Sequence, residues 1–158
     1  KRAAQGLPPL DANGIPKRMK ELELVQMKNQ QFDPDLFIPM KTGKTIDSLF
    51  TNSGGVPKAT NYIVVGDPGV GKSTVTMDIV ADLNEQGYKC LVISAEMTRI
   101  DLYEYVQRYP KFGNISILFL GEYIDDNPKD VIEEVISEGY DLVLLDSFAE
   151  IQEAVKEV

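Results

Sequence analysis

Short apolar runs alternate with longer amphipathic segments over the second part of the chain. The runs are rich in Val, Ile and Leu and are predicted to be buried strands: Tyr62–Val65, Cys90–Ser94, Ile115–Leu120 and Asp141–Asp146. The segments that follow them are predicted to be helices: 72–83, 98–109, 128–138 and 150–158. Strands that alternate with helices favour a parallel sheet covered on both faces. The pattern therefore predicts an α/β fold.

Residues with known helix-end preferences support these boundaries. Thr98 is a suitable N-cap for the second predicted helix, and Pro110 follows its end. Gly139 stands where the third predicted helix would stop.

The first 40 residues follow a different pattern, and we expect them to form an N-terminal arm. Residues 1–16 are rich in proline and glycine, which is typical of an extended linker. Residues 17–32 place apolar side chains among charges, which predicts a short amphipathic helix. Its apolar stripe has two candidate partners, its own domain or a neighbouring subunit, and amphipathicity does not separate them. Residues 41–158 are predicted to form the core domain.

Between the first apolar run and the first predicted helix, the chain reads GDPGVGKS and fits G-x-x-x-x-G-K-[ST] without a mismatch. In this pattern backbone N–H groups point at phosphate oxygens, and the N-terminus of the following helix favours the anion. We expect Lys72 to reach the β- and γ-phosphates, Ser73 to ligate Mg²⁺ and Thr74 to contact the α-phosphate. The alternative is a glycine-rich turn that holds no ligand. The predicted binding residues are Gly66, Asp67, Pro68, Gly69, Val70, Gly71, Lys72, Ser73 and Thr74.

A nucleotide site of this kind also needs carboxylates near the loop. Asp146 ends an apolar strand, and we expect its carboxylate on the Mg²⁺ side of the site. The alternative is an ordinary strand-end aspartate that caps the next turn. Glu96 follows the strand 90–94, and the carboxyl ends of parallel strands share one edge of a sheet. We interpret Glu96 as the group that orients the attacking water. The alternatives are that Glu96 is a surface glutamate near a helix start, or that Glu150 is the acid with this role.

The composition limits the chemistry open to the chain. It has a net charge of −9, no histidine and one cysteine, Cys90. An intrachain disulfide, a Cys/His zinc site and histidine acid–base catalysis are therefore excluded. The acidic balance disfavours broad DNA binding by this part of the chain, but leaves room for a basic loop or a DNA-binding segment elsewhere. No apolar run approaches the ~20 residues of a membrane helix and no signal peptide is visible, so a cytoplasmic location without membrane contact is expected.

The order of these motifs resembles that of a known family. GDPGVGKST, LVISAEMT and LVLLDSF follow one another as in the RecA-type P-loop ATPases, with the nearest likeness to their RadA and KaiC branch. Upstream, Thr42-Gly43, Ile46–Phe50 and Gly54–Pro57 are similar to the TG…LD.LL.GG pattern that these proteins carry before the first core strand. The resemblance covers about residues 40 to 150.

The resemblance implies a RecA-like P-loop NTPase core, a parallel sheet flanked by helices that is incomplete at the C-terminal end. It implies that Lys72, Glu96 and Asp146 are catalytic and that Ser73 and Asp146 bind the metal. The implied cofactors are ATP and Mg²⁺. Tyr103 falls where RecA has an adenine-stacking tyrosine. Such proteins commonly work as rings or filaments, so we expect a homo-oligomer that contacts DNA through segments outside this chain.

Two features depart from the RadA and KaiC pattern. Glu96-Met97 stands where those proteins usually have two adjacent glutamates, and it looks more like the DnaB-type helicases. The zinc finger of RadA has too few ligands in this sequence.

Three functions follow from these observations. The first is hydrolysis of Mg·ATP by an oligomeric ATPase in DNA recombination, repair or unwinding. The second is a KaiC-like nucleotide-gated switch or assembly module that does not act on DNA, and the acidic balance favours it mildly. The third is a P-loop kinase acting on a small molecule, and the lack of an evident Arg-rich lid in the sequence argues against it.

Overall fold

The computed structural model describes residues 24–123 and 125–156 of the 158-residue chain. The chain forms two compact units, and the boundary between them follows Asp33. In residues 24–33 the regular element is a short 3-10 turn, η2 (Met27–Asn29), and Leu24 is 99% exposed. The predicted helix over 17–32 is therefore wrong for its described end, because a short amphipathic segment gains its helical stability from burial. Its earlier residues and the predicted linker lie outside the described residues, and the boundary expected at residue 40 stays a prediction.

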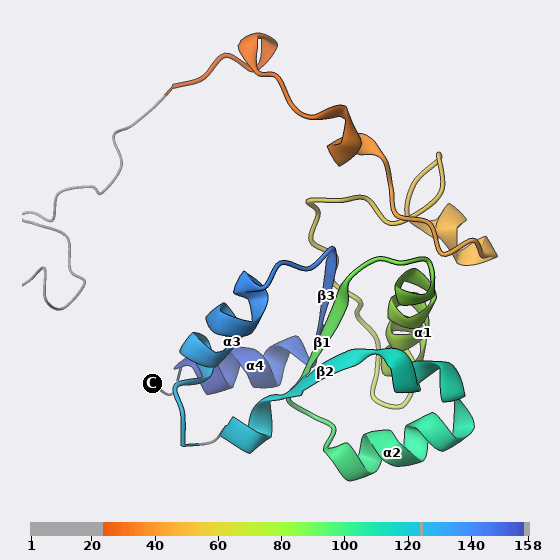
Figure 1. The fold of residues 1–158 in the computed structure, drawn as a ribbon, viewed down its shortest axis with the longest axis vertical. Helices are drawn as coiled ribbons and strands as arrows, with labels where there is room; N and C mark the ends of the chain where they lie inside the picture. The colour runs from red at the N-terminus through yellow and green to blue at the C-terminus, as the bar shows by residue number, and fades with distance from the viewer. Residues whose placement is uncertain (1–23, 124, 157–158) are drawn as a thin grey trace, which may run out of the picture. The chain divides into compact units, whose positions relative to one another are not determined.

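The unit that begins at Pro34 contains a three-stranded parallel sheet (Figure 1). Its strands are β1 (Cys90–Ser94), β2 (Ser116–Phe119) and β3 (Leu142–Asp146), in the order β2-β1-β3. Ser94, the last residue of β1, is in register with Phe119 on one side and with Asp146 on the other. The carboxyl ends of the three strands therefore meet at one edge of the sheet.

Helices cover both faces of this sheet, as predicted (Figure 1). The α-helices are α1 (Lys72–Glu85), α2 (Arg99–Arg108), α3 (Pro128–Ser137) and α4 (Phe148–Lys156). The 3-10 segments of this unit are η3 (Pro34–Phe37), η4 (Thr45–Leu49), η5 (Pro110–Asn114) and η6 (Leu120–Tyr123). Side chains of β1 alternate between two cores: Cys90 and Val92 pack with α1 and α2, whereas Leu91 and Ile93 pack with α3 and α4. The predicted α/β architecture is confirmed.

The helix ends follow the sequence signals closely. Thr98 caps α2 in a capping box, in which its side chain accepts from Asp101 N and the Asp101 carboxylate accepts from Thr98 N. Asn127 caps α3 by accepting a hydrogen bond from Lys129 N at 3.0 Å. Gly139 lies just beyond α3 with a φ of 75°, a conformation that glycine adopts without strain.

The apolar run Tyr62–Val65 does not form a strand, so this prediction is wrong. Ile63 and Val65 are 82% and 86% exposed, and within the described residues nothing pairs with the outer edge of β3. An apolar run becomes a strand only where a neighbour offers free backbone groups and a surface that covers its side chains. Here the run is an irregular connection that leads into the glycine-rich loop.

The upstream motif at residues 40–56 folds on itself around Asp47. The Asp47 carboxylate accepts hydrogen bonds from Thr42 N at 3.0 Å, Thr42 Oγ1 at 2.8 Å and Gly43 N at 3.0 Å. Gly55 N donates to Asp47 O at 2.8 Å. Gly55 has a φ of 97°, and a Cβ there would lie 2.5 Å from Met40 O, so only glycine fits. One closed turn therefore explains the spacing of threonine, aspartate and glycine in this motif.

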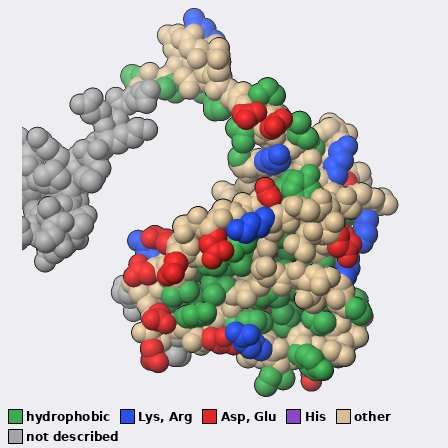
Figure 2. Space-filling view, in the orientation of Figure 1, with side chains coloured by type: hydrophobic (Ala, Val, Ile, Leu, Met, Phe, Trp, Pro, Cys, Tyr) green, Lys and Arg blue, Asp and Glu red, His purple; other side chains and the backbone are tan. Residues whose placement is uncertain are grey.

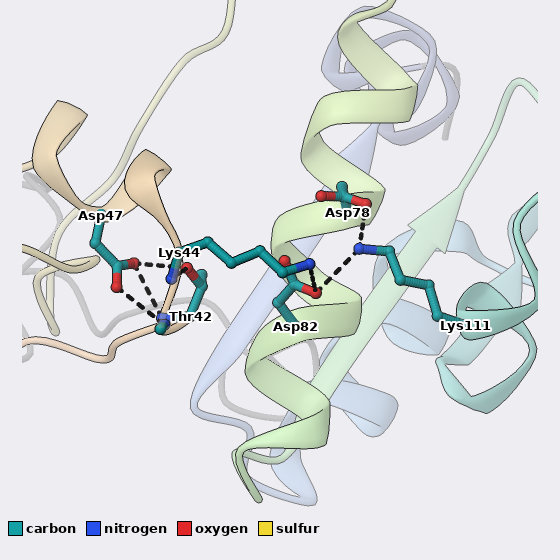
Figure 3. A network of polar contacts seen from close by, with 7 residues as sticks. Thr42, Lys44, Asp47, Asp78, Asp82 and Lys111 are labelled. Atoms are coloured by element: carbon teal, nitrogen blue, oxygen red, sulfur yellow. Dashed lines mark hydrogen bonds and ion pairs between the residues drawn. The ribbon is translucent and has the colours of Figure 1, made fainter.

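Ion pairs join this motif to α1 and η5 (Figure 3). Asp82, on α1, is 2% exposed, and its Oδ1 accepts from Lys44 Nζ at 2.7 Å and from Lys111 Nζ at 3.0 Å. Lys111 also pairs with Asp78. Burial alone would lower the pKa of Lys111, but its bonds to Asp78 and Asp82 outweigh this and hold the pKa above its usual value. One buried carboxylate thus ties three segments of the core together.

The first prediction concerns this carboxylate. Replacing Asp82 by alanine should lower the free energy of unfolding by about 1–3 kcal/mol, because Lys111 then keeps only Asp78 and Lys44 loses its one carboxylate partner among the described residues. The matched control is Asp78→Ala on the same helix, where the carboxylate is 43% exposed and a loss below about 1 kcal/mol is expected. Urea unfolding of the full chain measures both, and equal losses would contradict the structural role of Asp82.

A second prediction concerns the single thiol. Cys90 is 2% exposed, and burial, with a smaller contribution from Asp141, raises its pKa to about 11. At pH 8 the thiolate fraction is then on the order of 0.001. A thiol reagent should therefore label the native chain far more slowly than the urea-unfolded chain, which should take up one label. Rapid labelling of the native chain would show that the core around β1 opens easily.

Candidate nucleotide-binding site

The glycine-rich loop at residues 66–71 leads directly into α1. Gly69 and Gly71 have φ values of 78° and 94°, and Gly71 is the N-cap of α1. These left-handed conformations turn the chain into the helix and are readily adopted only by glycine. The loop and the helix N-terminus are therefore arranged as the motif predicts, although the strand expected before the loop is missing.

Lys72 folds back over its own loop. Its Nζ donates to Gly66 O at 2.8 Å and to Asp67 O at 2.9 Å. Both partners are neutral carbonyl oxygens, whereas a phosphate oxygen carries negative charge and accepts a stronger hydrogen bond from an ammonium group. The ammonium group is thus held within the loop by partners that a phosphate can replace.

Ser73 and Asp146 meet at the start of α1. Ser73 Oγ donates to Asp146 Oδ1 at 3.3 Å, across 73 residues of sequence. Asp146 is 9% exposed, and its second carboxylate oxygen, Oδ2, is buried and has no hydrogen-bond partner among the residues that the structure describes. The peptide bond from Asp146 to Ser147 is cis.

This arrangement fits a magnesium ion. A buried carboxylate oxygen without a partner is costly, and a hard cation satisfies it. Mg²⁺ prefers oxygen ligands and usually takes one or two from the protein, the others coming from water and phosphate. Ser73 and Asp146 would supply the two protein oxygens.

Glu96 lies beyond the end of β1, at the same edge of the sheet as Asp146. Ala95 N donates to Asp146 O at 2.8 Å, and the Ser94 hydroxyl fixes the following turn through hydrogen bonds with Met97 N and O at 3.1 and 2.9 Å. Glu96 itself is exposed and, in the part of the chain that the structure describes, forms no hydrogen bond or ion pair with Lys72, Ser73 or Asp146. Its catalytic role stays a prediction.

Two tyrosines of α2 have different surroundings. Tyr103 is 67% exposed and lines a shallow groove with Leu102, Val106 and residues of β2, so its role as an adenine-stacking residue stays a prediction. Tyr105 instead forms a hydrogen bond through its hydroxyl with Thr74 Oγ1. Sequence reasoning missed Tyr105 because the helix carries several tyrosines, and only the packing of α2 against the core shows which one turns towards α1.

The fold and the candidate site indicate which class of protein this chain resembles. A glycine-rich loop that opens a helix, beside a strand-end aspartate, is the arrangement of a P-loop nucleotide-binding site. Residues 40–113, slightly less than half of the chain, match the ATPase family described as "ATPase: KaiC". The chain is also 29% identical over 94 residues to the DNA repair protein RadA of Campylobacter jejuni. These matches confirm the resemblance to the RecA-like P-loop ATPases of the RadA and KaiC branch.

The matches cover only part of this chain and of its relative. The match to RadA covers 60% of this chain and 20% of the length of that relative. No solved structure matches. The sheet and its helices fit part of a RecA-like core. Among the described residues, no helix has both the length and the apolar character needed to cross a membrane.

The third prediction tests the magnesium pair. If Asp146 holds Mg²⁺, replacing it by asparagine should weaken binding of Mg·ATP by roughly tenfold or more while changing binding of ATP in excess EDTA much less, because the lost charge would face the metal. The matched control is Asp141→Asn, because Asp141 directly precedes β3 at the end of the strand opposite to Asp146. This variant should leave the magnesium dependence of ATP binding intact. Titration of nucleotide with and without Mg²⁺ measures the effect. An equal loss in both conditions would remove Asp146 from the metal site.

Proposed function

We propose that this chain binds Mg·ATP and hydrolyses it as part of a RecA-like oligomeric ATPase that acts in DNA recombination, repair or unwinding. The observation that carries the proposal is the contact of Ser73 with the buried carboxylate of Asp146, next to Lys72 at the N-terminus of α1. Two far-separated motifs contribute to one phosphate-and-metal site, and a ligand-free glycine turn would not require this.

The residues have distinct roles in the proposed reaction. Backbone N–H groups of the loop and the N-terminus of α1 bind the phosphates. Lys72 exchanges its bonds to Gly66 O and Asp67 O for phosphate oxygens. Ser73 and Asp146 would hold Mg²⁺, which, when bound, neutralises charge that develops on the phosphates. Glu96, exposed at the same sheet edge, orients the attacking water by accepting a hydrogen bond from it.

The proposed DNA role is supported by the relative named a DNA repair protein. The charge distribution argues that the DNA contacts lie elsewhere than on α3. Exposed carboxylates gather on and beside this helix (Figure 2): Asp126, Asp130, Glu133, Glu134 and Glu138. Such a surface repels a polyanion. DNA contact is therefore assigned to segments outside this chain or to a neighbouring subunit, and a homo-oligomeric ring or filament in the cytoplasm remains part of the proposal.

The second candidate is a KaiC-like switch or assembly module that uses nucleotide without acting on DNA. The family match to KaiC and the acidic face over α3 favour it. Both candidates share the nucleotide site and differ only in what assembly or polymer it controls.

The fourth prediction separates these candidates. Phosphate release from Mg·ATP, measured with and without single-stranded DNA, should fall by a factor of roughly 100 or more in Lys72→Ala and in Glu96→Gln. Glu96→Gln should still bind Mg·ATP within about threefold of the unchanged chain, since its proposed role is in the chemical step. Glu104→Gln, an exposed glutamate on α2, is the matched control and should retain full turnover.

The outcomes discriminate clearly. Stimulation by DNA that disappears in Lys72→Ala supports the DNA-dependent ATPase. Turnover that ignores DNA, with an oligomeric state that follows nucleotide, supports the switch. Full turnover in Glu96→Gln would remove Glu96 from catalysis, and full turnover in Lys72→Ala would overturn the site itself.

A further inference from the structure

A hydroxyl pair links the first turn of α1 to α2. Tyr105 OH and Thr74 Oγ1 are hydrogen-bonded across 31 residues of sequence, and both residues are partly buried. Thr74 follows Lys72 and Ser73 directly, so it lies within the segment proposed to bind phosphate. The contact of Tyr105 is thus next to the candidate nucleotide-binding site.

The ring of Tyr105 is fixed independently of this hydrogen bond. Its centroid lies 5.7 Å from that of Tyr109 and 6.1 Å from that of Phe112, with the latter ring nearly parallel at 16°. Tyr105 also packs against the core cluster beneath α1. Packing of this kind holds the phenol in one orientation. The hydroxyl is therefore presented to Thr74 by a preformed aromatic cluster.

Donor and acceptor capacity suggests the direction of the bond. Each hydroxyl has one hydrogen to donate, and phosphate oxygens only accept. A phenolic hydroxyl is a stronger hydrogen-bond donor than an aliphatic hydroxyl, because its ring withdraws electrons from the oxygen. If Tyr105 donates to Thr74 Oγ1, the hydrogen of Thr74 remains available for a phosphate oxygen. Bonds in such a chain strengthen one another in a partly buried setting.

We propose that Tyr105 is a positioning residue for nucleotide binding, whose hydroxyl orients that of Thr74 towards a phosphate oxygen. This rests on the proposed function, because it requires the loop and α1 to bind nucleotide. It gives a role to a tyrosine of α2 that faces α1, and it is separate from the adenine-stacking role predicted for the exposed Tyr103.

The test uses variants of the full chain that remove one hydroxyl each. Tyr105→Phe keeps the ring and its stacking, and Thr74→Val keeps the β-branched shape. Tyr105→Phe should raise the Kd and KM for Mg·ATP about fivefold and leave kcat within about twofold, since the contact serves binding and not the chemical step. Tyr109→Phe, in the same aromatic cluster, is the matched control and should bind as the unchanged chain does.

The double variant separates positioning from independent contacts. If Tyr105 acts through Thr74, then Tyr105→Phe together with Thr74→Val should bind Mg·ATP no more weakly than Thr74→Val alone. Thermal unfolding without nucleotide accompanies each titration, and a purely structural role would lower Tm while leaving the Kd unchanged.

Failure of the inference differs from failure of the proposed function. An unchanged Kd in Tyr105→Phe, or additive losses in the double variant, overturns the role of Tyr105 while the unchanged chain still binds Mg·ATP and Lys72→Ala does not. If the unchanged chain binds no better than Lys72→Ala, both the proposed function and the role of Tyr105 are overturned.

Discussion

The parallel pairing of β1 with β3 is the constraint on which the site depends. It places Ser94 in register with Asp146 and joins their strand ends through the hydrogen bond from Ala95 N to Asp146 O. β1 is the central strand and is buried along its whole length, so its position is set by packing on both faces. Because β1 cannot slip by one residue without exchanging its two cores, the edge that carries Glu96 and Asp146 is fixed by the hydrophobic pattern itself.

Local signals predicted much of this architecture. The helix beginning at Lys72, the cap at Thr98, the stop at Gly139 and the three strands of the sheet all follow from spacing, capping and apolar runs. The strand predicted at Tyr62–Val65 is wrong because four apolar residues indicate only a preference for burial. Burial also needs a neighbouring surface, and no local pattern specifies one. The helix predicted over residues 17–32 is wrong at its described end for the same reason, since Leu24 is 99% exposed.

The site was predictable to a different degree. The loop motif and the strand-end aspartate made Lys72, Ser73 and Asp146 candidates, because the loop spacing and the apolar strand that ends in Asp146 are visible in the sequence. The structure brings Ser73 and Asp146 into contact, and their roles in binding stay predictions. The contact of Tyr105 with Thr74 depends on how α2 packs against α1, and the ion pair of Lys44 with the buried Asp82 joins positions 38 residues apart. Such contacts between distant residues result from tertiary packing, and patterns in a single sequence do not predict them.

The net charge of −9 and an anionic ligand are compatible because they act over different distances. Charges in solution are screened over about 8 Å at physiological salt. The carboxylates of α3 lie over the opposite face of the sheet from α1, whereas a bound phosphate would be in direct contact with Lys72 and the helix N-terminus. A bound nucleotide would therefore interact mainly with the hydrogen-bond donors around it, whereas a long polyanion would also be repelled by carboxylates elsewhere on the surface. The acidic balance thus bears on the proposed contact with a polymer, and the loop chemistry bears on the proposed binding of a nucleotide.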